Sequence, residues 1–204
     1  MISNSSIRKV MNNKNIIRNT YKSIVCDKLV TSEIFSLIDS LKIKSICIYS
    51  PFPNEIKIDN LVSYLHKENI KIYFPYMRKL DNDFIMEIRK EHNTIFDDYH
   101  IKSSDGEKVD YNVVDAYLIP GIAFSSDGFR IGYGKGYYDR LLKDYQGIKI
   151  GVCENNRIIS ASFKESHDIS MDFLVTEDRI IGVKHVWFNI AYGWKRLKNR
   201  TKLQ

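Results

Sequence analysis

The residues best suited to chemistry lie in one glycine-rich segment, residues 113–142, which reads VVDAYLIPGIAFSSDGFRIGYGKGYYDRLL. Five of the ten glycines of the chain fall in it: Gly121, Gly128, Gly132, Gly134 and Gly136. Glycine adopts backbone conformations that other residues avoid, and it lets a ligand approach the main chain. An apolar run ending at Pro120, a glycine loop and a helix start form an arrangement whose backbone N–H groups bind phosphate. The glycines alone fit a tight turn between strand and helix equally well.

Charged residues within the segment favour phosphate binding over a simple turn. Arg130 and Lys135 lie in the loop, where their side chains can neutralise phosphate oxygens. Asp139 follows, and a carboxylate there can hold a magnesium ion that bridges those oxygens. The spacing matches neither the Walker motif nor the dinucleotide-binding motif, and Gly-Lys-Ser/Thr occurs nowhere in the chain. We therefore expect a phosphate site that is not a standard P-loop.

Two motifs of this segment are longer and more specific than its glycines. They are Pro-Gly-Ile-Ala-Phe at residues 120–124 and Arg-Ile-Gly-Tyr-Gly-Lys-Gly-Tyr-Tyr-Asp-Arg at residues 130–140. In order and length they resemble the signature of the 5-formyltetrahydrofolate cyclo-ligases, also called methenyltetrahydrofolate synthetases. The resemblance covers residues 13–181. It implies an ATP-dependent C–N ligase that uses ATP and Mg²⁺ to convert 5-formyltetrahydrofolate into 5,10-methenyltetrahydrofolate, by phosphorylating the formyl oxygen and closing the ring.

The resemblance also implies roles for residues of the loop and of the N-terminal region. Lys14 and Arg18, which are four apart and so share one helix face, match the Lys-x-x-x-Arg with which the family opens. Without the resemblance they would read as a solvated basic stripe. The expected catalytic residues are Arg130, Lys135 and Tyr138. The expected ATP-binding residues are Lys14, Arg18, Arg130, Gly132, Gly134, Lys135, Gly136, Tyr137 and Tyr138.

An acidic residue after the first expected strand is the candidate for holding the folate. Glu55, by itself an ordinary acid near a helix start, follows Tyr49 at the spacing of a Tyr-x-x-x-x-x-Glu segment of the family. The resemblance implies that its carboxylate contacts the pterin, whose amino and ring N–H groups can donate paired hydrogen bonds to it. Phe52 can pack on the flat ring. The expected folate-binding residues are Ser50, Phe52, Glu55, Tyr133 and Tyr137.

A second acidic position completes the expected metal site. His167-Asp168 precedes Phe-Leu-Val-Thr-Glu at residues 173–177 and resembles the second block of the family, although by itself it reads as a capping pair. The resemblance implies that Asp168 and Asp139 hold Mg²⁺ together, with Asp172 as the alternative to Asp168. We expect His167 to be structural, because magnesium prefers oxygen ligands.

The elements that must position these residues alternate between helix and strand. Helical spacing runs over residues 13–40, with Thr31 as the N-cap of a restart, and over residues 58–67. Strand patterns cover residues 43–49, 70–74, 84–90, 113–119, 147–153 and 173–177. Pro75 is expected to end the second strand, and residues 84–90 alternate as in a half-exposed edge strand. Residues 91–112 read as polar and irregular, and 154–157 as a turn.

This order predicts an α/β fold, a single layered domain with a mostly parallel sheet and helices on both faces. It is Rossmann-like and similar to the folds of sugar-phosphate isomerases and CoA transferases. Arg78 follows a strand end, where such sheets bind ligands, and fits an anion site or a plain surface position equally. Near residues 99–104 the family's usual Gly-Ile-x-Glu-Pro is missing, and Tyr-His-Ile-Lys-Ser-Ser stands in its place.

Composition limits the classes of protein to consider. The chain of 204 residues has no apolar run long enough to span a membrane, and its N-terminus lacks the apolar core of a signal peptide. Three widely spaced cysteines indicate neither a disulfide framework nor a zinc site, so a reducing cytoplasm is expected. The net charge of +6 comes from 31 basic and 25 acidic residues, and residues 181–204 hold six basic residues and no acid. A nucleic-acid footprint over the whole chain is therefore not indicated.

The charge pattern and the extent of the resemblance divide the chain into a cyclo-ligase domain, residues 13–181, and a basic aromatic extension, residues 182–204. We expect the extension to form a final helix that packs its aromatic residues on the domain. The alternative is a basic amphipathic segment at a membrane surface or on RNA. The expected state is a cytoplasmic monomer that binds a small folate and neither nucleic acid nor membrane.

Two other functions remain open at this point. Related layered folds host sugar-phosphate isomerases and CoA-transferase-like enzymes, because a fold does not determine a function. Such an enzyme would need no ATP, and no catalytic glutamate motif is evident. The second alternative is a non-catalytic protein that binds RNA or membrane through the basic extension.

Overall fold

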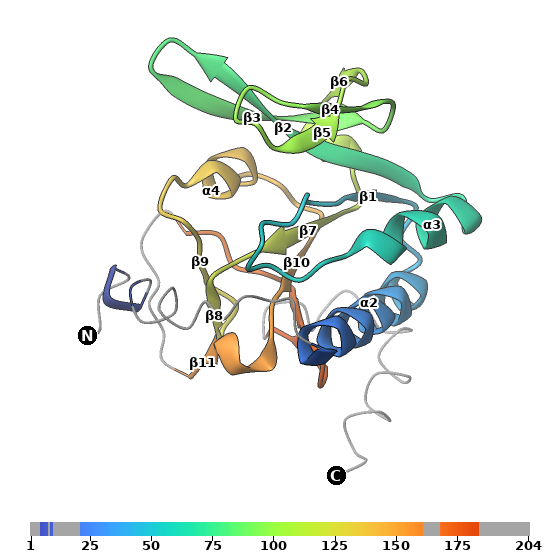
Figure 1. Ribbon diagram of the computed structural model, residues 1–204, viewed down its shortest axis with the longest axis vertical. Coiled ribbons are helices and arrows are strands. Elements are labelled where there is room, and N and C mark those ends of the chain that lie inside the picture. The colour runs from blue at the N-terminus through green and yellow to red at the C-terminus, as the bar shows by residue number, and fades with distance from the viewer. Residues whose placement is uncertain (1–4, 8, 10–20, 161–167, 184–204) are drawn as a thin grey trace.

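The structure, a computed structural model, describes residues 5–7, 9, 21–160 and 168–183 (Figure 1). Helices α2 (Tyr21–Leu41) and α3 (Asp59–Lys67) pack on one face of a central sheet, and the short α4 (Tyr137–Leu141) lies on the other. Two 3₁₀ turns, Tyr111–Val113 and Asn155–Arg157, stand in the connections. In this described part of the chain, no helix is long and apolar enough to cross a membrane.

The central sheet has eight strands in the order β13-β12-β10-β7-β1-β2-β3-β6. Its five middle strands are parallel: β1 (Ser45–Cys47), β2 (Lys71–Leu80), β7 (Ala116–Pro120), β10 (Ile148–Val152) and β12 (Phe173–Val175). Antiparallel strands complete the two edges: β3 (Asp83–Lys90), β6 (Lys108–Val109) and β13 (Ile180–Gly182). The mostly parallel α/β sheet predicted from the sequence is therefore confirmed.

The sheet separates two hydrophobic cores, which explains why its middle strands are apolar throughout. Along β7, Ala116 and Leu118 face the core beneath α2 and α3, whereas Tyr117 and Ile119 face the core beneath α4. All five residues of β7 are buried, because both of its faces are covered. The second core is also covered by a small sheet of β8 (Ala123–Ser125), β9 (Arg130–Ile131) and β11 (Ile158–Ile159). That sheet lies within connections that the sequence patterns left unassigned.

The expected break at Thr31 is wrong, because α2 runs without interruption through it. The hydroxyl group of Thr31 donates to the carbonyl of Asp27, one turn earlier, at 2.7 Å. Thr31 is buried and bonds backwards along the helix instead of capping a new one. The predicted part of this helix before Tyr21 lies outside the described residues.

The expected strand end at Pro75 is also wrong, because β2 continues to Leu80 and forms a long arm with β3. Parallel pairing with β1 reaches only Tyr73, so among the described strands Pro75 has a partner on the β3 side alone. A proline is tolerated where one edge of a strand needs no N–H donor. The arm and the segment after it extend beyond the rest of the sheet, at the top of Figure 1.

Residues 91–112 contain more regular structure than their polar sequence indicated. Within them lie β4 (Thr94–Phe96), β5 (Lys102–Ser104) and β6, and β4 and β5 form an antiparallel pair. Hydrophobic patterning cannot reveal strands this short, because most of their side chains face solvent or other polar groups.

Candidate active site at the carboxyl ends of the central strands

The parallel strands follow the order β2-β1-β7-β10-β12, so the chain direction across the sheet reverses between β1 and β7. After β1 the chain crosses through α3 to one side, and after β7 it crosses through α4 to the other. Ligands of open α/β sheets bind outside the carboxyl ends of the strands at such a reversal. This topology places the expected site beyond Cys47 and Pro120.

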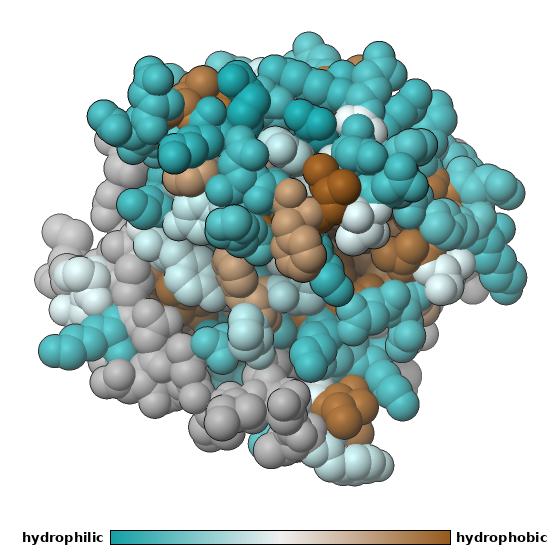
Figure 2. Space-filling model, turned by 45° about the horizontal axis from the view of Figure 1, so that its top comes forward, coloured by the Kyte–Doolittle hydropathy of each residue, from teal (hydrophilic) through white to brown (hydrophobic). Residues whose placement is uncertain are grey.

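A cavity of about 410 Å³ lies there. Four segments line it: the loop after β1, the β2–β3 arm, residues 97–101 and the loop that leads into α4. The lining residues are Tyr49, Ser50, Phe52, Pro53, Asn54, Glu55, Pro75, Met77, Met86, Asp97, Tyr99, Ile101, Pro120, Arg130, Tyr133, Lys135, Gly136, Tyr137 and Tyr138. Figure 2, in which the arm end of the molecule comes forward, shows a largely hydrophilic surface with apolar residues exposed near its centre.

Arg130 is the cation buried at this cavity. Its Nη2 donates to Oδ2 of Asp139 at 2.9 Å, and its Nη1 lies 3.5 Å from the carbonyl of Pro120. The two charged side chains are only 8% and 14% exposed. The Nε of Arg130 has no hydrogen-bond partner among the described residues. A buried guanidinium with a donor to spare is suited to an anionic ligand.

The glycine at position 132 is explained by this arginine. A Cβ atom on Gly132 would lie 2.3 Å from Nη1 of Arg130, so only glycine leaves room for the guanidinium. Gly136 adopts a left-handed conformation, with φ of 63°, immediately before α4. The helix that follows has five residues, so the loop and not a long helix offers N–H groups to a ligand.

A lysine and a tyrosine side chain, Lys135 and Tyr138, also line the cavity. Lys135 is exposed and lines it, and the carbonyl of Lys135 accepts a bond from Arg140 at 2.7 Å. The guanidinium of Arg130 lies 5.3 Å from the ring centre of Tyr138. Burial raises the pKa of Tyr138 well above its ordinary value, so its hydroxyl group stays protonated and is a potential donor at neutral pH.

Glu55 is a buried acid of the cavity, with an exposed fraction of 7%. Its Oε2 accepts the main-chain N–H of Phe52 at 2.9 Å, and its own N–H donates to the carbonyl of Phe52 at 3.0 Å. Burial raises the pKa of Glu55 to about 7, against the opposing charges of Arg130 and Arg157. This carboxyl group is therefore held in a tight turn and titrates near neutrality.

Two aromatic side chains stand beside Glu55. Phe52 and Tyr133 meet edge to face, with ring centres 5.5 Å apart. Burial raises the pKa of Tyr133 to about 12, and the charge of Glu55 acts in the same direction, so the hydroxyl remains a donor. An apolar ring pair beside a carboxyl group is suited to a flat ligand with N–H donors at its edge.

The expected metal ligands lie apart from the cavity lining. Asp139 uses Oδ2 for Arg130, and its Oδ1 makes no hydrogen bond or ion pair within the described residues. Asp168 is half-buried on a segment whose Ser170 forms a bridge with Phe129, the residue before β9. Among described residues, no three Asp, Glu, His or Cys side chains gather to hold a metal ion. The alternative ligand Asp172 accepts the N–H of Lys149 at 2.7 Å, and His167 lies outside the described residues.

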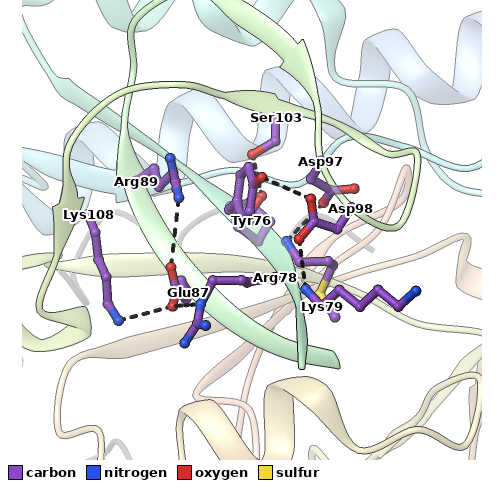
Figure 3. Close-up of polar contacts among 11 residues, drawn as sticks. Tyr76, Arg78, Lys79, Glu87, Arg89, Asp97, Asp98, Ser103 and Lys108 are labelled. Atoms are coloured by element: carbon purple, nitrogen blue, oxygen red, sulfur yellow. Dashed lines mark hydrogen bonds and ion pairs between the residues drawn. The ribbon is translucent and has the colours of Figure 1, made fainter. Parts of the chain in front are cut away.

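Nine of the sequence-predicted site residues are brought to the cavity: Ser50, Phe52, Glu55, Arg130, Tyr133, Lys135, Gly136, Tyr137 and Tyr138. Four others do not line it: Gly132, Gly134, Asp139 and Asp168. Lys14 and Arg18 lie outside the described residues. Arg78, the possible anion site, does not line the cavity and donates to Glu87 at 2.5 Å on the β2–β3 arm (Figure 3).

Sequence reasoning missed one wall of the cavity, formed by Met77 and Met86 of the arm together with Asp97, Tyr99 and Ile101. It also missed Arg157, whose Nη1 donates to the carbonyl of Ile122 at 3.0 Å and whose charge acts on Glu55. No local pattern marks these residues. Their place depends on chain segments that approach one another only in the folded protein.

Comparison with known proteins agrees with the motifs. The sequence model of the 5-formyltetrahydrofolate cyclo-ligase family matches residues 2–177. The 5-formyltetrahydrofolate cyclo-ligase of Mycoplasma genitalium is 29% identical over 158 residues, which cover 74% of this chain and 85% of that protein. The solved structure of Aquifex aeolicus 5,10-methenyltetrahydrofolate synthetase has a TM-score of 0.75 at 29% identity, with 89% of this chain and 93% of that chain covered.

A second solved structure, the 5,10-methenyltetrahydrofolate synthetase of Mycoplasma pneumoniae, shares the fold. Its TM-score is 0.68 at 22% identity, and the match covers 85% of this chain and 98% of that one. The α/β fold and the glycine-loop motifs thus agree with a family match over most of the sequence, and the chain belongs to the 5-formyltetrahydrofolate cyclo-ligase family.

Proposed function

We propose that this protein converts 5-formyltetrahydrofolate into 5,10-methenyltetrahydrofolate with consumption of ATP. The observation that carries the proposal is one cavity lined by two chemically different sets of residues. Glu55, Phe52 and Tyr133 supply an acid and a ring pair, and Arg130 and Lys135 supply the cations of the glycine loop. A pterin and a transferable phosphate can therefore occupy neighbouring positions in the same space.

The reaction needs this combination because a formamide is a poor electrophile and its oxygen a poor leaving group. Attack of the formyl oxygen on the terminal phosphorus of ATP releases ADP and leaves an activated carbon. The neighbouring folate nitrogen then bonds to that carbon and loses its proton, and inorganic phosphate departs. No protein nucleophile is required, so the work of the protein is positioning and charge stabilisation.

In this proposal the glycine loop binds the transferring phosphoryl group. Arg130 and Lys135 offset its charge, Tyr138 donates a hydrogen bond from its hydroxyl group, and main-chain N–H groups of the loop, that of Gly136 among them, donate to its oxygens. Lys14 and Arg18 contact ATP from the N-terminal region. The unpartnered Nε of Arg130 supports an anion at this position.

Magnesium fits the donor chemistry of Asp139, which lies beside Arg130. Oδ1 of Asp139 is not used by other described residues, and carboxylate oxygens are the ligands that Mg²⁺ prefers. We assign Asp139 and Asp168 as the residues that would hold it. When bound, the ion would offset charge on the phosphate oxygens. Asp139 also orients Arg130, whichever ligand is present.

The folate lies beside Glu55 in this proposal. Glu55 accepts hydrogen bonds from the pterin N–H groups, and Phe52 and Tyr133 pack on the ring. Ser50 and Tyr137 also line the cavity. We also propose a cytoplasmic monomer that binds no nucleic acid or membrane, with residues 13–181 as the catalytic domain and 182–204 as an extension. The family match ends at residue 177, which supports this boundary.

The direct test is formation of the methenyl chromophore. Purified protein, 5-formyltetrahydrofolate, ATP and Mg²⁺ are mixed, and absorbance of the product is followed beside reactions that lack ATP or contain a non-hydrolysable analogue. We expect product only with ATP, and one ADP released per product. Absence of the chromophore under all conditions would overturn the proposal. Turnover without ATP would favour an isomerase-like activity.

Replacing Asp139 tests the metal assignment. Asp139→Asn should lose most of its turnover at every Mg²⁺ concentration and lower the free energy of unfolding by about 3 kcal/mol, because Arg130 loses a buried charged partner. Asp144→Asn is the control, since Asp144 is an exposed acid close to α4. A normal Mg²⁺ titration of Asp139→Asn would remove Asp139 from the metal site.

A further inference from the structure

One wall of the cavity is built around a single buried carboxylate, Asp97, which is 4% exposed. Its Oδ1 accepts the main-chain N–H groups of Tyr99 and Ile101, each at 2.9 Å. Its Oδ2 accepts the N–H of Met77 at 2.9 Å. Both oxygens are therefore used to fold residues 97–101 and to tie them to β2. His100 within this loop has a φ of 59°, which completes the tight reversal.

The loop occupies the edge of β2 that β1 leaves free. Beyond Tyr73 no described strand of the sheet pairs with β2 on that side, and the N–H groups of Met77 and Lys79 donate to the carboxylates of Asp97 and Asp98. Ser103 adds a bond from its hydroxyl group to the carbonyl of Pro75 at 2.7 Å (Figure 3). Side chains thus replace the missing strand, and the loop is anchored from three positions.

The anchored loop places Tyr99 in an aromatic group of its own. The ring of Tyr99 lies 4.8 Å from that of Phe84 on β3 and 6.3 Å from that of Tyr137 on α4, both edge to face. This group differs in its members from the Phe52–Tyr133 pair beside Glu55. The cavity therefore contains two aromatic regions, and Ile101, Met77 and Met86 add apolar surface to its lining.

We propose that Tyr99 contacts the aryl ring of the substrate, the aminobenzoyl group that follows the pterin, and that Asp97 is the positioning residue that holds Tyr99 there. The inference rests on the proposed function and specifies its substrate contacts. A reduced folate has two flat groups in sequence, and two aromatic regions in one cavity match them. Of the two regions, the one with Glu55 suits the pterin, because only the pterin has several N–H donors along its edge.

The test uses two substrates that differ only in the aryl group. One is 5-formyltetrahydrofolate, and the other is an N5-formylated tetrahydropterin whose attacking nitrogen carries a methyl group instead of the aminobenzoyl group. Release of ADP is measured over substrate concentrations that span KM, so that kcat and KM are obtained for both. Tyr99→Ala should lower kcat/KM for the full folate roughly 5- to 20-fold through KM, and leave the truncated substrate unchanged. Tyr99→Phe should behave as the wild type.

Tyr64→Ala is the matched control, because Tyr64 stacks on Phe35 with ring centres 4.0 Å apart and does not line the cavity. It should leave the ratio of the two kcat/KM values unchanged. An equal loss for both substrates in Tyr99→Ala, or no loss for either, would overturn the inference. A wild-type protein that turns over neither substrate would overturn the proposed function and this inference with it.

Asp97 is tested in the same assay. Asp97→Ala frees three main-chain N–H groups and should reproduce the selective loss for the full folate, and adding Tyr99→Ala should lower the ratio no further. Asp98→Ala is its control, since Asp98 binds the N–H of Lys79 and the hydroxyl of Tyr76 and does not line the cavity. If Asp97→Ala is too unstable to purify, the Tyr99 variants alone test the inference. A folded Asp97→Ala with the wild-type ratio would remove Asp97 from the positioning role.

Discussion

At the scale of single residues, the site depends on charged groups that are buried together. Arg130 and Asp139 form an ion pair at 2.9 Å with little exposure on either side. Such a pair is sensitive to the loss of one member, because the other is left charged and buried. Asp139 therefore has a structural task in orienting Arg130, and this task exists whether or not it also binds a metal.

Glu55 provides a pH test at the same scale. Its pKa is raised from 4.5 to about 7 by burial, so the folded protein keeps a proton that the unfolded chain has released. The stabilising contribution of the protonated group is full below pH 4.5 and is lost as the pH rises to about 7. Over this window the free energy of unfolding should fall by about 3 kcal/mol through Glu55 alone.

Urea unfolding of the wild type and of Glu55→Gln at several pH values measures this loss. The difference in free energy of unfolding between the two proteins should shrink or change sign as the pH falls, because glutamine does not titrate. The folate affinity of the variant should be low and independent of pH around 7, whereas kcat/KM of the wild type should rise through pH about 7 as the carboxylate ionises. Parallel pH curves for the two proteins would show that Glu55 has an ordinary pKa.

At the scale of elements, the glycine loop leaves space for the side chain of Arg130. The sequence pattern suggested that the glycines free N–H groups for a phosphate. The structure adds that Gly132 is required sterically, because any side chain there would collide with the guanidinium of Arg130. Gly136 is required for another reason, its left-handed backbone, and a Cβ there would meet no atom closer than 3.6 Å.

Alanine at these two glycines should separate the two effects. Gly132→Ala should displace Arg130 and raise the KM for ATP more than about tenfold, the loss expected for one charged hydrogen bond. Gly136→Ala should lower the free energy of unfolding by about 1 kcal/mol through backbone strain and leave Arg130 in place. Steady-state kinetics and thermal unfolding of both variants are the measurements. Equal ATP kinetics in the two variants would contradict the inference that Gly132 leaves space for the guanidinium of Arg130.

At the scale of the whole molecule, the reversal of strand order decides where the site forms. Loops after β1 and β7 meet there because their strands are neighbours in the sheet, although they are far apart in the sequence. The family match does not reach the basic extension. Residues 184–204 carry six basic residues and no acid, and the family match ends before them.

Truncation after Val183 is the test at this scale. Val183 is buried in the second core and is retained. We expect the shortened protein to keep its folate and ATP kinetics. Any binding to RNA or to anionic vesicles that the full chain shows should disappear, because the truncation removes six basic residues and no acid. A loss of turnover in a folded truncated protein would place the extension in the active site.

Much of the fold could be read from the chain without its structure. The buried strands around residues 113–119 and 147–153 correspond to β7 and β10, and the helix over 58–67 corresponds to α3. These elements have strong periodic patterns. The predictions at Thr31 and Pro75 were wrong because the local preferences of these residues were overridden. The hydroxyl group of Thr31 bonds back to the preceding turn, and Pro75 lies where β1 no longer pairs with β2.

The motifs at residues 120–124 and 130–140 sufficed to recognise the resemblance to the family, which the family match confirms. They also predicted a phosphate site, because cations and accessible backbone are encoded there within a few adjacent residues. Tertiary structure alone determined that Arg130 pairs with Asp139, that Glu55 is buried, and that Asp97 and Tyr99 form a cavity wall. Burial, pairing and the shape of a cavity arise from segments that are distant in sequence. They come together only when the strands have taken their order in the sheet.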